Sequence, residues 1–123
     1  MRIDRITIAV ENMDAMVQFY NAVFDTRLMA VGPQNIPEFY KGRLGEVDLL
    51  FCPNSVVEVV AEKNRQQFRF VVDDLEAILV KVGQAGGRTL DDSIRNGTLK
   101  VCGVEDPDNN TIEFVQYPGD AQS

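Results

Sequence analysis

Residues 5–15 and residues 67–77 of this chain carry nearly the same pattern of side chains, 62 positions apart. In each segment, alternating residues lead to a valine, Val10 in the first copy and Val72 in the second. An acid, an Asn or Asp, a hydrophobic residue, a second acid and an alanine then follow in both. Because repetition at a fixed spacing constrains the architecture before any finer assignment, the pattern predicts two copies of one structural unit. Packed about a pseudo-twofold axis, such copies would bring equivalent side chains together.

Length and composition fit one globular domain. The chain has 123 residues, 45% of them hydrophobic, which is enough for a real core. No apolar run approaches the roughly 18 residues that a membrane span needs, and residues 1–4 lack the shape of a signal peptide. Cys52 and Cys102 do not form a CxxC pair. They predict free, buried thiols and a cytoplasmic location, with one disulfide as the alternative.

The charge balance narrows the class of partner. The formal net charge is −7, whereas nonspecific nucleic-acid binding needs a basic surface that neutralises phosphates. An anionic membrane surface is disfavoured for the same reason, so neither partner is expected. A neutral or cationic small ligand remains compatible with this charge. The chain also has no histidine, the ligand that would favour zinc, iron or nickel at a metal site.

The first copy begins with a predicted strand and helix. Residues 3–10 alternate in character, as a half-exposed strand does. Asn12 is a good N-cap, and apolar residues at helical spacing predict an amphipathic helix over residues 13–24. Phe19 and Tyr20 belong to its apolar stripe and are expected in the core. Further strands are predicted at residues 26–31, 39–44, 47–51 and 56–60, with Gly42 and Gly45 as bulges or a tight turn.

The second copy repeats this order. A strand is predicted at residues 67–72, with Asp74 as N-cap of a helix that Gly86 and Gly87 end through a left-handed residue. Residues 91–97 resemble a hairpin loop. Later strands are predicted at residues 88–90, 99–105 and 111–116, and a turn at residues 106–110 separates the last two.

Each copy is therefore a strand and helix followed by about three strands, and neither copy alone can bury both its helix and its sheet. We expect one α+β domain over residues 1–123, in which two tandem βαβββ modules form a curved mixed sheet around a central cleft. Module 1 spans about residues 1–62, module 2 about residues 63–118, and residues 119–123 are a polar tail. The modules could pair within one chain or between two chains.

Two further motifs accompany the repeat: Phe19-Tyr20 in the first helix, and the segment DPDNNTIE at residues 106–113. Together these features resemble the vicinal oxygen chelate superfamily, which contains the glyoxalases, the fosfomycin- and bleomycin-resistance proteins and the extradiol dioxygenases. The resemblance covers residues 3–116 and implies the glyoxalase/bleomycin resistance/dioxygenase fold. It also implies a homodimer with U-shaped clefts, in which enzyme members use a divalent metal to chelate two neighbouring oxygens of a substrate.

The resemblance places the family's metal-ligand positions at Arg5 and Gln67 on the first strands, and at Glu58 and Glu113 on the last strands of the modules. The two glutamates supply oxygen ligands and Gln67 an amide oxygen. Arg5 cannot bind a cation, because its guanidinium has only donors and stays protonated. A metal held by Glu58, Gln67 and Glu113 would have to be a hard ion such as Mg²⁺ or Mn²⁺.

A metal-free centre explains the same positions more simply. Arg5 would form a charge-assisted pair with Glu113 or Glu58 and so neutralise carboxylates that a metal would otherwise neutralise. Thr7 shares the strand face of Arg5 and leaves room for a ligand. In the second copy, Arg69 shares the strand face of Gln67, and it either lines the cleft or covers the ion pair.

The favoured function is therefore a small-molecule-binding protein without the usual metal site, which sequesters a drug or metabolite and needs no cofactor. The alternative is a metal-dependent glyoxalase-type lyase or isomerase, or a dioxygenase, that uses Glu58 and Glu113. A metal-free enzyme with one of these two as general base ranks lower, because a neighbouring arginine would lower the pKa of that acid. A purely structural or regulatory module has no positive support, and the sequence leaves open whether any reaction is catalysed.

Overall fold

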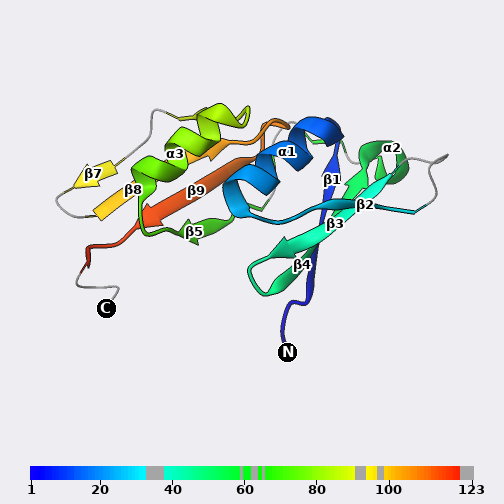
Figure 1. The fold of residues 1–123 in the computed structure, drawn as a ribbon, viewed down its shortest axis with the longest axis horizontal. Helices are drawn as coiled ribbons and strands as arrows, with labels where there is room; N and C mark the ends of the chain where they lie inside the picture. Colours follow the sequence, from blue (N-terminus) through cyan, green and yellow to red (C-terminus); the bar gives the residue numbers. More distant parts are fainter. Residues whose placement is uncertain are drawn as a thin grey trace. The chain divides into compact units, whose positions relative to one another are not determined.

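The chain forms two compact units, Met1–Ala61 and Glu62–Ser123, in a computed structural model. Each unit has its own sheet and helices (Figure 1). None of the helices in the described part is long and apolar enough to cross a membrane. The structure describes residues 1–32, 38–58, 60–61, 64, 66–90, 94–96 and 99–119.

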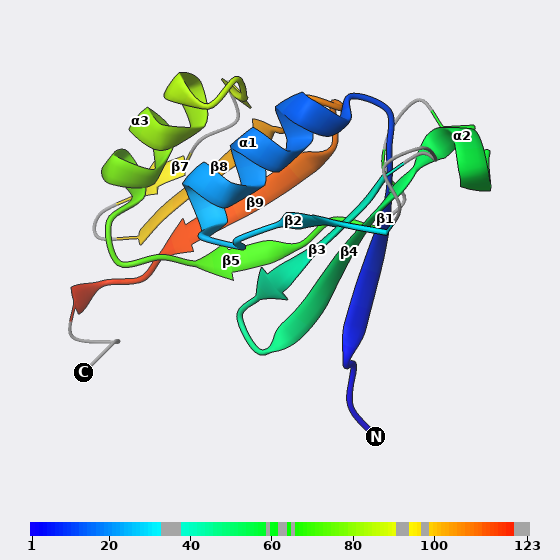
Figure 2. The ribbon, with the colours of Figure 1, turned by 45° about the vertical axis from the view of Figure 1, so that its right-hand side comes forward.

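The first unit is built on a four-stranded mixed sheet with the order β1-β4-β3-β2 (Figure 2). The first strand lies parallel to β4, whereas β3 runs antiparallel to both of its neighbours. Its elements are β1 (Arg5–Val10), α1 (Met13–Phe24), β2 (Met29–Val31), β3 (Phe39–Leu44), β4 (Val47–Pro53) and α2 (Asn54–Val57).

The second unit repeats this pairing scheme. Its strand order is β5-β9-β8-β6, with β5 parallel to β9, the other pairs antiparallel, and β7 added on β8. Its elements are β5 (Arg69–Val71), α3 (Leu75–Gln84), β6 (Arg88–Thr89), β7 (Ile94–Asn96), β8 (Leu99–Glu105) and β9 (Thr111–Gln116). The predicted α+β class, with a helix and a mixed sheet in each half, is confirmed.

The apolar faces of the sheets form the core. Phe19 and Tyr20 of α1 are 0% and 4% exposed, and the Tyr20 ring meets the edge of Phe51 on β4 at a centroid distance of 5.1 Å. Both aromatic residues are therefore core, as predicted. Cys52 and Cys102 are free and buried, which confirms the expectation of thiols over that of a disulfide.

The helix ends follow local side-chain chemistry. Asp74 caps α3, because its Oδ1 accepts the Ala77 backbone N–H at 3.2 Å. The same helix ends where Gly86 takes a φ of +90°, and the Gly87 N–H donates to the Val82 carbonyl at 2.9 Å, as in a Schellman motif. The predicted stop is confirmed. Asn12 occupies the N-cap position of α1, but its side chain makes no capping hydrogen bond.

The end of the first unit differs from its predicted structure. A strand was expected at residues 56–60, but β4 continues to Pro53 and is followed at once by the short helix α2. Val56 and Val57 are 52% and 43% exposed, so no sheet face selects their β-branched side chains for a strand. Glu58 ends the helix with a left-handed φ of 54°, and its N–H donates to the Asn54 carbonyl at 2.8 Å.

Gly42 is neither a bulge nor a turn residue. It lies within β3, where a Cβ atom would come within 2.3 Å of the Thr26 carbonyl oxygen. That carbonyl accepts the Arg43 N–H at 2.9 Å, so the close approach belongs to the packing of the α1–β2 connection on β3. Gly45, with a φ of +60°, is the residue that makes the turn between β3 and β4.

The turn between β8 and β9 is organised by Asp106, which is 2% exposed. Its Oδ1 accepts the backbone N–H groups of Asp108 and Asn110, both at 2.9 Å, and its Oδ2 accepts the Asn110 amide at the same distance. Asn109 takes the left-handed φ of 66°. The predicted turn is confirmed, and its role is to start β9 in the correct register. The predicted hairpin loop at residues 91–97 instead contains β7, and residues 91–93 and 97 lie outside the described part.

Candidate functional site

Arg69 and Glu113 form an ion pair across the second sheet. They are direct partners in the register of β5 and β9, and Arg69 Nε donates to Glu113 Oε1 at 2.5 Å. The hydrogen bond to Glu113, reinforced by the charge of that carboxylate, raises the pKa of Arg69 above its usual value. This carboxylate is therefore already neutralised by a fixed cation of its own unit.

Gln67 lies just before β5 and is likewise engaged. Its amide oxygen accepts the Thr111 hydroxyl at 2.8 Å. Thr111 is also held by Asn64, whose Oδ1 accepts the Thr111 N–H at 3.0 Å and whose Nδ2 donates to the Thr111 carbonyl at 3.0 Å. The structure thus brings Gln67, Arg69 and Glu113 together on one strand pair, with the amide oxygen of Gln67 facing a hydroxyl donor.

Arg5 lies near Asp48, an acid that is not among the predicted site residues. Its partner in the register of β1 and β4 is Asp48. Asp48 Oδ1 accepts Arg43 Nη1 at 2.8 Å, and Lys41 Nζ is 3.9 Å from Oδ2. The hydrogen bond from Arg43 lowers the pKa of Asp48 against an opposing effect of desolvation, and the charges of Lys41, Arg43 and Arg5 lower it further.

This residue could have been found from the sequence. Asp48 is the one acid within the predicted strand at residues 47–51, and the strand period of two places it on the face opposite Leu49. The neighbouring predicted strands contain Arg5, Lys41 and Arg43. An acid next to such basic residues is a candidate for cross-strand pairing. The predicted pairing of Arg5 with Glu113 involves both units and stays a prediction.

The expected match between Glu58 and Glu113 is wrong. Thr7, which precedes Arg69 by 62 positions, pairs with Leu50 in the register of β1 and β4, as Arg69 pairs with Glu113. Leu50 therefore holds the strand position that Glu113 holds in the second unit. Glu58 lies beyond the strand, because the chain turns into α2 after Pro53.

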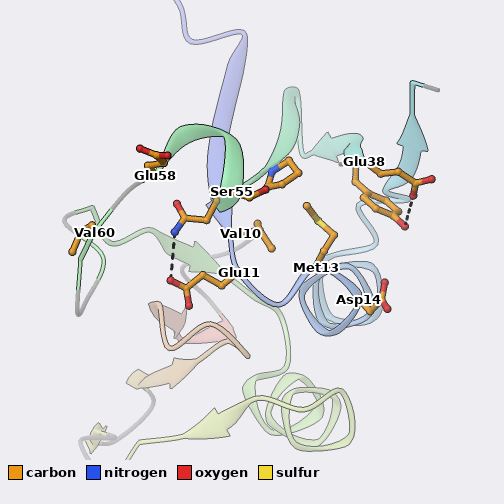
Figure 3. Close-up of a pocket in the computed structure, with 11 residues that line it drawn as sticks. Val10, Glu11, Met13, Asp14, Glu38, Ser55, Glu58 and Val60 are labelled. Atoms are coloured by element: carbon orange, nitrogen blue, oxygen red, sulfur yellow. Dashed lines mark hydrogen bonds between the residues drawn. The ribbon is translucent and has the colours of Figure 1, made fainter. Parts of the chain in front are cut away.

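Glu58 instead borders a hollow of the first unit, with a volume of about 670 Å³. The ends of β1 and β4, the starts of α1 and β3, and the segment around α2 surround it (Figure 3). The residues that line it are Val10, Glu11, Met13, Asp14, Glu38, Tyr40, Pro53, Asn54, Ser55, Glu58 and Val60. Sequence patterns alone do not predict this site, because its residues come from three separate stretches of the chain.

The hollow is acidic. Among the described residues, four carboxylates line it and no lysine or arginine does. The Tyr40 hydroxyl donates to Glu38 Oε2 at 3.4 Å, and Asn54 Nδ2 donates to Glu11 Oε1 at 3.5 Å. Desolvation, followed by the charges of Glu38 and Asp14, raises the pKa of Tyr40, so the phenol stays a neutral donor.

Comparison with known protein families shows which family this fold belongs to. A family model described as the Glyoxalase/Bleomycin resistance protein/Dioxygenase superfamily matches residues 2–114. The chain belongs to this superfamily. A search of curated proteins gave no match to the sequence.

Solved structures of the superfamily share the fold at low sequence identity. A glyoxalase/bleomycin resistance protein/dioxygenase family enzyme from Burkholderia phytofirmans PsJN aligns with a TM-score of 0.73 and 17% identity, covering 94% of this chain and 98% of its own. The fosfomycin resistance protein FosX from Mesorhizobium loti gives 0.70 and 17%, covering 99% and 96%. TnmS3, an antibiotic binding protein from Streptomyces sp. CB03234, gives 0.67 and 15%, covering 95% and 96%.

The residues of this chain do not suit the divalent metal that the superfamily implies. The candidate positions offer a guanidinium at Arg5, an amide oxygen at Gln67 that already accepts a hydroxyl, and a carboxylate at Glu113 that pairs with Arg69. The side chain of Leu50 has no atom that could bind a metal ion. Within the described ranges, no group of three or more His, Cys, Asp or Glu side chains is placed to hold an ion.

Proposed function

We propose that this member of the superfamily binds a small organic molecule without a resident metal ion, and that it sequesters a drug or metabolite. The observation that carries this proposal is the ion pair between Arg69 and Glu113, with 2.5 Å between Nε and Oε1. It neutralises the carboxylate that would otherwise be the best oxygen ligand of the second unit.

Metal binding at Glu113 would have to displace or tolerate this guanidinium. Arginine stays protonated at every accessible pH, so the competing charge cannot be titrated away. A divalent ion at Glu113 would bind a carboxylate whose charge Arg69 already offsets. The ion would also be repelled by the guanidinium itself. The side chain of Leu50 cannot compensate, since it has no oxygen.

The hollow of the first unit supports the binding part of the proposal. Its volume falls within the range of about 300–1,000 Å³ that is usual for small-molecule sites. Its lining combines apolar side chains with carboxylates and other polar groups that can fix the orientation of a ligand. Two relatives of the same fold are by name an antibiotic binding protein and a fosfomycin resistance protein, which favours a drug or metabolite as the ligand class.

A ligand screen by thermal shift in chelator-treated buffer tests this function. A ligand at a hundredfold excess over its Kd stabilises the folded protein by about 2.7 kcal/mol. We expect at least one small organic molecule to raise the Tm without added metal, and the shift to be the same after addition of Mn²⁺ or Mg²⁺. Stabilisation by a divalent ion alone, with no response to any organic molecule, would contradict the proposal.

A homodimer and a cytoplasmic location remain predictions beside this proposal. Light scattering of the purified protein tests the first, and fractionation of cells that express the chain tests the second. Catalysis by Glu113 is not part of the proposal, because its carboxylate is already held in an ion pair with Arg69.

A further inference from the structure

We infer that the hollow of the first unit takes an organic dication, a molecule with two positively charged groups joined by an apolar segment. This inference rests on the proposed function and names the ligand class of its site. It stands on three features of the hollow: the distribution of carboxylates, the apolar surface between them, and the aromatic ring at one end.

Three of the four carboxylates lie on opposite sides of the hollow. Figure 3 shows Glu58 on one side, and Glu38 with Asp14 on the other. None of these three carboxylates forms an ion pair with a lysine or arginine in the part of the chain that the structure describes. Among the described residues no cation neutralises their negative charge, and a ligand that used both sides would need a positive group at each end.

The spread of these groups excludes a compact inorganic cation as the best fit. A divalent metal needs several oxygen ligands at about 2.0–2.6 Å, whereas no three acidic side chains among the described residues converge in this way. An anionic ligand is disfavoured as well, because no lysine or arginine is among the described residues that line the hollow. Charged groups held apart on an extended molecule match the carboxylates better.

The surface between the acidic sides is partly apolar. Val10 and Met13 lie between Glu58 and Glu38 in Figure 3, and Val60 borders the hollow beside Glu58. Val60 is 95% exposed, so its side chain is available to cover an alkyl or aryl segment of a ligand. A hydrated metal ion or a small inorganic cation would gain nothing from this surface.

Tyr40 completes the end that holds Glu38. Its hydroxyl donates to Glu38 Oε2, which fixes the carboxylate beside the ring. An aromatic face next to a carboxylate attracts an ammonium group through both its quadrupole and the neighbouring charge. This end is therefore suited to an alkylated or primary ammonium group rather than to a neutral donor.

Isothermal titration with α,ω-diaminoalkanes, from diaminobutane to diaminododecane, tests the inference on the full chain. We expect binding to strengthen with the alkyl length that spans the hollow and to weaken as NaCl is raised, since salt screens exposed charges. The dicarboxylate and the diol of the same length serve as matched probes without positive charge, and both are expected to bind at least tenfold more weakly.

The variants Glu58→Gln and Glu38→Gln remove one charge from each side. Each is expected to weaken diamine binding about two- to fivefold, with little effect on binding of a monoamine at the opposite end. Glu46→Gln removes the same charge from the exposed turn between β3 and β4, outside the hollow, and should leave the Kd unchanged. The three variants differ from the wild type only by isosteric substitutions, so loss of folding is not expected.

The outcomes separate the two proposals. Binding of diols or dicarboxylates with affinity equal to the diamines, or an unchanged Kd in both Glu58→Gln and Glu38→Gln, would overturn the dication while leaving metal-independent ligand binding intact. Failure of every organic molecule in the thermal-shift screen would overturn both.

Discussion

The two units of this chain share one arrangement of strands and place different chemistry on it. In the second unit, Arg69 on the first strand faces Glu113 on the last strand. In the first unit, the arginine of the first strand is Arg5, two residues earlier along the strand than Thr7, and it faces Asp48. The position that matches the pair Arg69 and Glu113 is filled by Thr7 and Leu50. Packing of the apolar face of each sheet determines the fold. The residues on the polar face can therefore differ in charge between the two units.

The largest expected loss of stability tests whether the cores of the two sheets are equivalent. Phe51 and Phe114 occupy matched positions of β4 and β9 and are 0% and 1% exposed. Phe51 contacts Tyr20 at 5.1 Å, and Phe114 contacts Phe70 at 5.9 Å, both between ring centroids. Replacement of either by alanine should lower the free energy of unfolding by about 3–5 kcal/mol, as measured by urea denaturation. If only one of the two variants lost stability, the two cores would not be equivalent.

The next effect tests the close approach that distinguishes the first sheet. Gly42→Ala places a Cβ within 2.3 Å of the Thr26 carbonyl, and backbone must shift to accept it. We expect a loss of about 1–3 kcal/mol, as in other overpacked cores. Gly83→Ala, where an added Cβ meets nothing within 4 Å beyond its chain neighbours and its own helix backbone, is the matched control and should be neutral or stabilise α3 by up to about 1 kcal/mol. Equal Tm values for the two variants would contradict the packing described for β3.

Much of the fold could be predicted from the sequence, because the relevant signals are local. The helix at residues 13–24 and the strands at residues 99–105 and 111–116 have the predicted bounds. Each has a clear period, and the Asp106 turn carries its own hydrogen-bond acceptors. The strand expected at residues 56–60 failed, because β-branched side chains favour a strand only where a sheet face buries them.

The candidate site was harder to predict, since it depends on register. The ion pair between Arg69 and Glu113 joins residues 44 positions apart in the sequence, and strand alternation alone does not show which residue faces which. The error over Glu58 has the same origin, because its assignment assumed that the last strand of the first unit lay at residues 56–60. The hollow could not be seen at all, since strand ends and loop segments form it only after folding.

The smallest expected change concerns Asp48, the paired acid of the first sheet. The hydrogen bond from Arg43 lowers the pKa of Asp48, so this acid stabilises the fold above its unfolded pKa, and the contribution is lost as pH falls through the lower folded value. Asp48→Asn should therefore destabilise the protein slightly near neutral pH and have no effect in strong acid. Denaturation curves at several pH values check this, and an effect that grows with acidity would contradict it.

The central claim is that a guanidinium holds Glu113 in the place of a metal. Elemental analysis of protein purified without a histidine tag tests it most directly, with Glu113→Ala as the comparison. The account predicts less than stoichiometric Mn, Mg, Zn, Fe or Ni in the wild-type protein and no change in the variant. One divalent ion per chain that disappears with Glu113→Ala would contradict it.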